Sequence, residues 1–467
     1  MERPLSLEEA KAMFKLEDTH AKRSRHRPSK GRILMISEHA DPIARPGSKE
    51  VGGQNVYVYH LARELGRLGW DVDVYTRWDN AAKRQTVTFG RRARVIRVKC
   101  GPKHYVVRDT LYDYLPEFAD NIVAYKREHG LEYDLIHSHY WMSGWIGLKL
   151  RSLWDIPLVT TYHSLGKVRH EALKAMKEIG PHNNFFEFRT HWELELAEKS
   201  DLILSTSPYE VEDIRKYYQP RQMQVAVTPI GIDPALFHPI QKDIARRKIG
   251  EPPERKLLLY VGRIEWRKGI ETLIKSMAIL RASPDLAGKD LRLLIVGRKS
   301  GPERTEVSRL QLLAQQLGVA DLVVFKGSAD RSQVRTYYSA ADVCVVPSYY
   351  EPFGIVPLEA LTCRCPVIAS RVGGLQYTVQ DGQNGFLVPP QDPAAIAKHA
   401  EEILTGRSTI QEKVNRFAEL VIPTKWHWDK IAREVESDYQ ETMERRRSAK
   451  LSQTYEAPYE NRALSPA

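Results

Sequence analysis

Short apolar runs rich in β-branched residues alternate with longer amphipathic stretches from Arg32 onward, and the pattern restarts after a segment rich in Pro and Gly, residues 229–234. This alternation predicts βα units, because a helix must return the chain before the next parallel strand can be added to a sheet. Two such series predict an α/β protein with two doubly wound, Rossmann-like domains that face one another across a cleft. Ligands bind in such folds at the carboxyl ends of the strands.

The expected strands of both series are apolar runs bounded by polar or turn-forming residues. In the first series they are 32–37, 72–76, 94–99, 135–139, 158–162 and 202–205, and in the second 257–262, 291–296, 322–325, 343–346, 367–369 and 386–388. Apolar residues at helical spacing predict helices over 56–68, 269–281 and 307–317.

The same pattern predicts how the chain divides. We expect a polar, basic tail over 1–30, an acceptor-binding domain over 31–233 and a donor-binding domain over 234–425. An apolar stripe predicts a helix over 426–446 that crosses back toward the first domain, with a flexible tail over 447–467. The stripe consists of Trp426, Trp428, Ile431, Val435 and Tyr439.

The chain of 467 residues has a net charge of +11, from 70 Lys and Arg against 59 Asp and Glu. This excess suits anionic partners, but much of it lies in residues 20–32 and 445–450, and no RNA-recognition, zinc-finger or basic-zipper pattern is present. We therefore expect no nucleic-acid partner. No apolar run is long enough to span a bilayer and the first residues are charged, so we expect a cytoplasmic protein with no membrane partner.

Two motifs in the second series carry charges that suit a nucleotide sugar. Arg263 and Lys268 follow the first strand and precede a helix, where they could clamp a diphosphate. Glu351 and Glu359 flank a Pro-Phe-Gly turn that begins another helix, and a carboxylate can accept two hydrogen bonds from a ribose diol. The free backbone N–H groups at the start of that helix could hold sugar or phosphate oxygens; they belong to Phe353, Gly354 and Ile355.

The first series places polar loops after its strands. A Gly-rich turn opens the first long helix, and two further polar segments end the strands at 135–139 and 158–162. Two His at i and i+2 lack an obvious third metal ligand in sequence, so we expect a polar cleft wall there and no metal site. Several cations on neighbouring loops would suit a phosphate on a small acceptor. The candidate residues are Gly52, Gly53, Gln54, Tyr140, Thr161, His163, Lys103, Arg108, Lys167 and Arg189.

Other patterns have simpler explanations. Asp71 and Asp73 match a D-x-D motif, but they begin an expected strand, whereas metal and nucleophile motifs of that kind lie at strand ends. Cys363 and Cys365 form a C-x-C pair without a second pair to complete a zinc site, and we expect all four cysteines to be reduced.

The second-series motifs together resemble the retaining glycosyltransferases of family 4, which have the GT-B fold. The resemblance runs from about Arg32 to Tyr439. It implies that Arg263 and Lys268 hold the donor diphosphate, that Glu351 lies by the donor sugar and that Glu359 binds the ribose. It also implies that Gly53 and the Phe353–Ile355 backbone contribute to the donor site, that His163 contacts the sugar ring and that no metal is essential.

The acceptor loops of the first series are similar to those of sucrose-phosphate and sucrose synthases. This resemblance implies transfer of glucose from UDP-glucose to fructose 6-phosphate, with a separate sucrose-phosphate phosphatase as pathway partner. In it, Gly52, Gln54, Tyr140 and Thr161 lie on the acceptor side, and Lys103 or Arg108, and Arg189, lie near its phosphate. Lys167 is a further loop cation expected on the acceptor side. The same loops also look like the mycothiol-pathway transferase that glycosylates inositol phosphate.

The sequence is also compatible with other functions. Within the enzyme class they are another donor (ADP-glucose, GDP-mannose or UDP-GlcNAc) or another acceptor, such as inositol phosphate or unphosphorylated fructose. Outside it, the chain would be a regulatory protein that binds a nucleotide sugar without turning it over.

Overall fold

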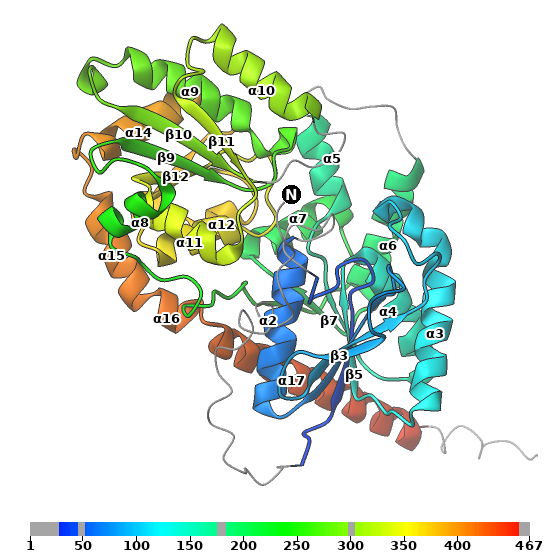
Figure 1. Ribbon diagram of the computed structural model, residues 1–467. Helices are drawn as coiled ribbons and strands as arrows, with labels where there is room; N and C mark the ends of the chain where they lie inside the picture. Colours follow the sequence, from blue (N-terminus) through cyan, green and yellow to red (C-terminus); the bar gives the residue numbers. More distant parts are fainter. Residues whose placement is uncertain (1–27, 45–51, 175–183, 298–303, 457–467) are drawn as a thin grey trace, which may run out of the picture.

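The computed structural model describes residues 28–44, 52–174, 184–297 and 304–456. Two lobes lie side by side, each built around its own sheet, and a long C-terminal helix runs beneath the lobe that contains the N-terminal part of the chain (Figure 1). The expected α/β fold with two Rossmann-like domains is confirmed.

The first domain contains an eight-stranded sheet with the order β3-β4-β2-β1-β5-β6-β7-β8. All neighbouring strands are parallel except the β3–β4 pair, which is antiparallel. The strands are β1 (Arg32–Ile36), β2 (Asp71–Arg77), β3 (Thr86–Thr88), β4 (Ala93–Val98), β5 (Leu135–His139), β6 (Leu158–Thr161), β7 (Leu202–Ser205) and β8 (Val225–Val227).

Helices cover both faces of this sheet. Apolar side chains of α2 and α17 pack on one face, and those of α3, α4, α6 and α7 pack on the other. The helical elements in this part of the chain are α2 (Gly53–Leu68), η1 (Arg108–Tyr114), α3 (Leu115–Glu128), α4 (Trp141–Trp154), α5 (Gly166–Lys174), α6 (Asn184–Lys199) and α7 (Pro208–Tyr218). Because helices cover both faces, the side chains of the central strands β1, β2, β5, β6 and β7 are almost all buried, including the polar ones.

The second domain contains a six-stranded sheet, entirely parallel, with the order β11-β10-β9-β12-β13-β14. Its strands are β9 (Lys256–Val261), β10 (Leu291–Val296), β11 (Val323–Gly327), β12 (Val343–Val346), β13 (Val367–Ser370) and β14 (Gly385–Val388). The helical elements are α8 (Lys242–Ile249), η2 (Trp266–Lys268), α9 (Ile270–Ala282), η3 (Pro284–Leu286), α10 (Arg304–Gln316), α11 (Arg331–Ala340), α12 (Ile355–Thr362), α13 (Leu375–Thr378), α14 (Pro393–Leu404), α15 (Ile410–Leu420) and α16 (Ile422–Lys425).

The C-terminal helix α17 (Trp428–Glu456) ties the two domains together. Trp426 packs in the core of the second domain, whereas Trp428 and Tyr439 pack under the first sheet. The chain therefore crosses from the second domain to the first between these two tryptophans. The Ile232 N–H donates to the carbonyl of Trp426 at 2.7 Å, so the two connections between the domains run side by side.

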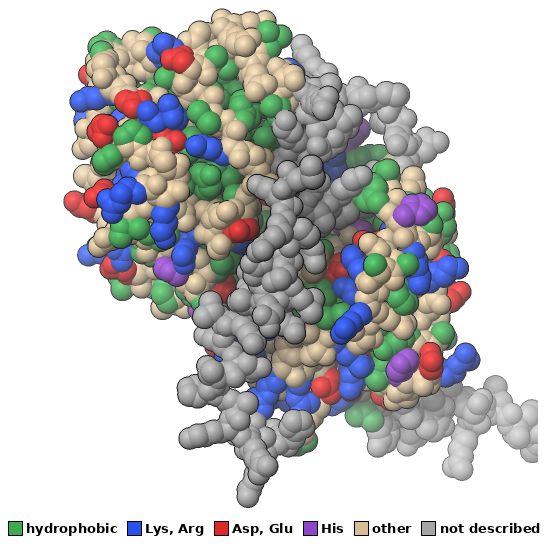
Figure 2. Space-filling view, in the orientation of Figure 1, with side chains coloured by type: hydrophobic (Ala, Val, Ile, Leu, Met, Phe, Trp, Pro, Cys, Tyr) green, Lys and Arg blue, Asp and Glu red, His purple; other side chains and the backbone are tan. Residues whose placement is uncertain are grey.

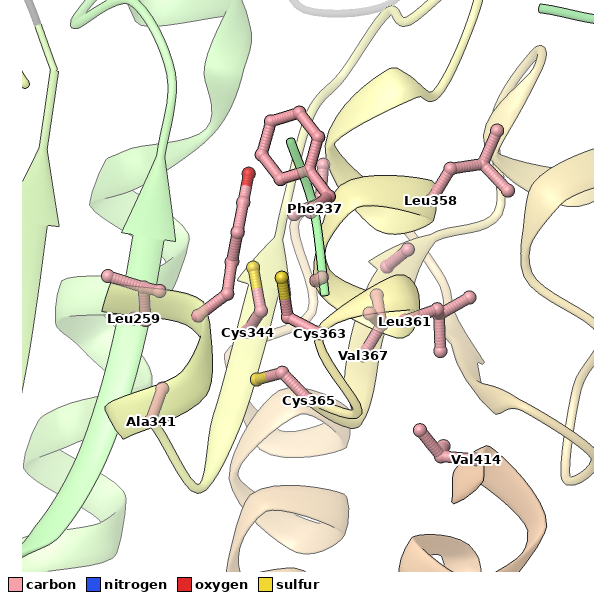
Figure 3. Packing of buried hydrophobic residues seen from close by; sticks show 14 of the residues in the cluster. Phe237, Leu259, Ala341, Cys344, Leu358, Leu361, Cys363, Cys365, Val367 and Val414 are labelled. Atoms are coloured by element: carbon pink, nitrogen blue, oxygen red, sulfur yellow. The ribbon is translucent and has the colours of Figure 1, made fainter. Parts of the chain in front are cut away.

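The cysteine thiols do not form a metal site in the part of the chain that the structure describes. Cys344, Cys363 and Cys365 lie together in the apolar core of the second domain, beside Phe237 and Leu361 (Figure 3). Burial raises the pKa of the Cys365 thiol to about 12, which keeps it protonated. All four cysteines are free, as the sequence predicts.

Two short strands escape sequence analysis. β3 and β8 each have three residues and lie at opposite edges of the first sheet, where only one neighbour pairs with them. Their side chains are half-buried or exposed, so the long apolar run that marks a central strand is missing. Among the described residues, no helix combines the length and the apolar character needed to cross a bilayer.

Candidate active site between the two domains

The two domains contact each other directly at the carboxyl ends of β6 and β12. Tyr350 follows β12, and its hydroxyl accepts the N–H of Leu165 at 3.2 Å and lies 3.3 Å from the hydroxyl of Ser164, which follows β6. Residues from both sheets therefore meet at the edge where ligands bind in this class of fold.

Lys268 and Glu351 form a close ion pair at this edge, although 83 residues separate them in sequence. Lys268 lies in η2 after β9 and Glu351 follows β12, which neighbours β9 in the sheet. Burial disfavours the charge on Glu351, but the adjacent Lys268 ammonium outweighs it and holds the carboxyl pKa below its ordinary value. The pair thus places a fixed cation and a fixed carboxylate at one point of the interdomain edge.

Arg263 lies near this pair but is more exposed. Its guanidinium is 3.6 Å from Glu265, and the Arg267 guanidinium lies 2.5 Å from the same carboxylate oxygen. About half of the Arg263 side chain is exposed, so it can turn toward an incoming anion without breaking a buried contact. Lys268 and Arg263 therefore place two cations directly after β9, at the edge where the two domains meet.

The Pro-Phe-Gly turn brings the donor-side motif against the first domain. The Phe353 ring lies 5.2 Å from the ring of His163, and a Cβ atom on Gly53 would come within 3.1 Å of Phe353. Gly354 precedes α12 with a φ of 78°, a conformation that favours glycine, and the backbone of Ile355 begins that helix. The turn therefore directs the start of α12 toward the first domain's Gly-rich loop.

Glu359 lies one turn into α12 and is buried. One of its oxygens accepts from Arg331 at 3.0 Å and the other from the Tyr338 hydroxyl at 3.0 Å. Burial raises the pKa of the carboxyl despite these two donors. Sequence analysis missed Arg331 and Tyr338, because a cation and a tyrosine on a separate helix, α11, carry no signal of their own.

His163 follows β6 and adopts a φ of 60°, which is uncommon for a residue other than glycine. Its Nε2 atom lies 2.9 Å from Nδ1 of His139, which ends β5. Burial drives the pKa of both imidazoles well below the usual value, and the nearby His137 adds to this shift. The two rings are therefore neutral, and one of them donates an N–H hydrogen bond to the other.

Tyr140 also has a positive φ, 82°, at the end of β5, and it is buried. Strained backbone of this kind persists where surrounding structure imposes it, and it clusters at functional sites. Tyr140 follows β5 and His163 follows the neighbouring strand β6. Both strained residues therefore lie in the first domain, at the edge that faces the second domain.

The remaining residues of the Gly-rich loop hold the strand ends in place. The Gln54 amide donates to the Ser37 hydroxyl at 3.1 Å and to the carbonyl of His139 at 3.2 Å, and the Gly52 N–H donates to the Asn55 side chain at 2.9 Å.

His137 connects the ends of two strands to the C-terminal helix. The Thr161 hydroxyl lies 2.9 Å from Nε2 of His137, whose Nδ1 contacts the Tyr439 hydroxyl of α17 at 2.6 Å. His137 is fully buried and bridges the end of β6 to the C-terminal helix.

The predicted acceptor-side cations are placed unequally. Arg189 is buried, donates to Glu193 at 2.7 Å and to the carbonyl of Ser164 at 2.6 Å, and its guanidinium lies 5.0 Å from the Tyr140 ring. The ammonium of Lys167 donates to the carbonyl of Tyr217 at 2.7 Å. The structure thus brings Arg189 to the His163 loop and anchors it there.

Lys103 is exposed, with its ammonium 3.5 Å from the Trp78 ring, and no described contact links it to Arg189. Arg108 begins η1, and its side chain lies outside the described residues. Glu193, the buried partner of Arg189, was missed by sequence analysis even though Arg-x-x-x-Glu is the spacing of an ion pair on one helix face.

A second group of polar residues follows β1 and was also missed. Asp41 accepts from Arg97 at 2.8 Å, Glu38 contacts His39 at 2.5 Å, and all four side chains are buried or nearly so. The signal was present in the sequence, because Glu-His-Ala-Asp directly follows the first strand and so lies at the carboxyl edge of the sheet. Asp71 and Asp73, by contrast, begin β2 at the opposite edge, as expected.

Comparison with known proteins agrees with this arrangement. Residues 51–236 match the family model of Glycosyltransferase Family 4, and residues 241–420 match that of Glycosyl transferases group 1. A D-inositol 3-phosphate glycosyltransferase from Corynebacterium diphtheriae is 37% identical over 412 residues, which cover 87% of this chain and 94% of that protein. This chain belongs to glycosyltransferase family 4.

Another D-inositol 3-phosphate glycosyltransferase, from Acidothermus cellulolyticus, is 34% identical over 423 residues, covering 90% of this family 4 chain and 92% of the relative. Among solved structures, the sucrose-phosphate synthase from Thermosynechococcus elongatus superposes with a TM-score of 0.78 at 36% identity and covers 88% of this chain and 99% of its own. The GT-B fold implied by the sequence motifs is confirmed by this similarity.

Proposed function

We propose that this glycosyltransferase moves a hexose, with retention of anomeric configuration, from a nucleoside diphosphate sugar to a hydroxyl of a small phosphorylated acceptor. The observation that carries the proposal is the Lys268–Glu351 ion pair, which lies beside the interdomain contacts of Tyr350 and Phe353. A cation at that point can stabilise the charge that grows on a leaving diphosphate.

The reaction follows from this placement. The acceptor hydroxyl forms a bond to the anomeric carbon while the bond from that carbon to the diphosphate oxygen breaks, and the electron pair leaves with the diphosphate. The acceptor hydroxyl attacks on the face of the sugar from which the diphosphate leaves, so retention needs no protein nucleophile, and its proton passes to an oxygen of the leaving phosphate, so no protein base is needed. Lys268 and Arg263 stabilise the negative charge on the departing diphosphate, and Glu351 keeps Lys268 oriented. The neutral His163 faces the donor sugar.

The phosphate on the acceptor is supported by two kinds of relative. D-inositol 3-phosphate glycosyltransferases at 37% and 34% identity match most of this chain, and the substrate in their name is a cyclitol that carries a phosphate. On this basis we place an inositol phosphate first among acceptors, ahead of the fructose 6-phosphate expected from the loop motifs. Sucrose-phosphate synthase, at 36% identity over 88% of the chain, keeps fructose 6-phosphate as the second candidate, and that route would need a separate phosphatase.

The test is a matrix of donors against acceptors with product mass as the readout. UDP-glucose, UDP-GlcNAc, ADP-glucose and GDP-mannose are each paired with inositol 3-phosphate, inositol, fructose 6-phosphate and fructose. We expect one donor to give product with a phosphorylated acceptor and far less with the same acceptor lacking phosphate. Saturable donor binding without product in any pair would favour a regulatory protein instead.

A further inference from the structure

A cavity of about 410 Å³ lies on the first domain at the amino ends of β1, β2 and β4. The candidate active site lies at the carboxyl ends of strands in the same parallel sheet, so the cavity lies at the opposite edge of this domain. The residues that line it are Arg32, Asp71, Asp73, Thr88, Arg91, Arg92, Ala93 and Arg94. Figure 2 shows several basic side chains on the lobe that carries β3.

The cavity wall carries four arginines and only two aspartates. Each carboxylate oxygen is already used: Asp71 accepts from Arg92 at 3.1 Å and from Arg32 at 3.2 Å, and Asp73 accepts from Arg94 at 2.6 Å and 3.0 Å. The Asp73 side chain is almost wholly buried, so it serves to fix the guanidiniums and cannot itself bind a cation from solvent.

Two of the guanidiniums, those of Arg32 and Arg94, have N–H groups that could donate to a ligand. A guanidinium has five N–H groups. In the described contacts Arg32 uses one N–H from each terminal nitrogen, toward Asp73 and Asp71, and Arg94 uses Nε and one terminal nitrogen toward Asp73. Both arginines therefore have N–H groups that are not used in the described contacts with Asp71 and Asp73. The Thr88 hydroxyl adds a neutral donor to the same wall.

We propose that this cavity is a second ligand site, which binds a small polyanion bearing a diphosphate, such as inorganic pyrophosphate or the phosphates of a nucleotide. Pre-oriented guanidiniums match phosphate oxygens in pairs of hydrogen bonds, and orientation by Asp71 and Asp73 lowers the entropy lost on binding. The volume lies within the range of small-molecule sites, roughly 300–1,000 Å³. Seven of its eight lining residues are polar or charged and four of them are arginines, which favours an anion over an apolar ligand.

The test is calorimetric titration of the full chain with inorganic pyrophosphate. Because the proposed donor site also binds a diphosphate, the wild type is compared with Lys268→Ala, which removes that contribution. The probe for the cavity is Arg91→Glu, since Arg91 is exposed on the β3–β4 hairpin and takes no part in the described ion pairs of Asp71 and Asp73. Arg84→Glu is the matched control: it makes the same charge change at an exposed position outside the cavity lining.

We expect Lys268→Ala to retain saturable pyrophosphate binding. Adding Arg91→Glu to it should weaken that binding by at least about tenfold, because a repulsive charge replaces an attractive one, whereas adding Arg84→Glu should leave it nearly unchanged. Equal melting temperatures establish that the variants are folded. The proposal is overturned if Lys268→Ala binds no pyrophosphate, or if both charge reversals weaken binding alike.

Discussion

Nδ1 of His139 lies 2.9 Å from Nε2 of His163, and burial keeps both rings neutral. The His163 ring is therefore held by the His139 ring. The ring of His137 packs against His139 and is itself hydrogen-bonded to Tyr439 of the C-terminal helix. The conformation of His163 thus depends on residues from β5, β6 and α17 together.

His139 is expected to act as a positioning residue. His139→Leu should lower kcat by about 10- to 100-fold, because a small displacement of a group at the reaction centre has effects of that size, with little change in the KM of either substrate. His139→Asn keeps a polar atom near the position of Nδ1 and should recover part of the rate. A fall in stability with unchanged kcat in both variants would show a purely structural role.

Lys268 should be required for donor turnover. Lys268→Ala is expected to lower kcat/KM by roughly 100- to 1,000-fold, the usual loss when one charge-stabilising donor is removed. Lys275→Ala is the control, since Lys275 is exposed on the nearby helix α9 and pairs only with half-buried Glu271 among its described contacts. Near-normal kcat/KM in Lys268→Ala would remove the diphosphate-clamp role.

Arg189 should matter more for phosphorylated acceptors than for unphosphorylated ones. Arg189→Met leaves Glu193 buried without its partner, so a loss of stability of about 3 kcal/mol or more is also expected. The double variant Arg189→Met/Glu193→Met removes the unpaired charge and should recover stability while still discriminating poorly between acceptors. If both variants lower the rates with inositol and inositol 3-phosphate by the same factor, the acceptor-phosphate role is wrong.

The stability of the fold should depend on pH through His60, which stacks on Trp428 of α17. Burial lowers its pKa to about 3, from 6.5 for the free side chain. The unfolded chain therefore binds a proton at His60 between these pH values and the folded chain does not, so stability falls as pH drops from 6.5 toward 3. The slope from this group is at most about 1.4 kcal/mol per pH unit.

His60→Phe keeps a ring at this position and cannot titrate. Its free energy of unfolding, measured by urea denaturation at several pH values, should gain on that of the wild type as pH falls below 6.5. A pH-independent difference between His60→Phe and the wild type would contradict this prediction.

Chelation should leave transfer intact. We expect the same initial rate with excess EDTA as with added Mg²⁺ or Mn²⁺, because Lys268 and Arg263 already supply positive charge at the proposed diphosphate position. Loss of activity with EDTA, restored by one metal, would show that the two side chains are insufficient.

Much of the fold could be predicted because central parallel strands are buried on both faces and appear as apolar runs. β5, β7, β10 and β12 have the predicted limits. The edge strands β3 and β8 could not be found, since a strand with one neighbour need not be apolar. The helix predicted over 426–446 begins later, at Trp428, because the stripe is shared: Trp426 belongs to the second core and Trp428 to the first.

The sequence alone determined the two-domain α/β class, the family and the identity of the charged motifs, because strand periodicity and short loop motifs are local properties of the chain. Only the tertiary structure decided which of those residues meet. It paired Lys268 with Glu351 across neighbouring strands, placed Phe353 against His163 across the domains, and gave Glu359 a buried partner on α11, Tyr338. Such pairings depend on strand order and domain contact, which no local pattern encodes.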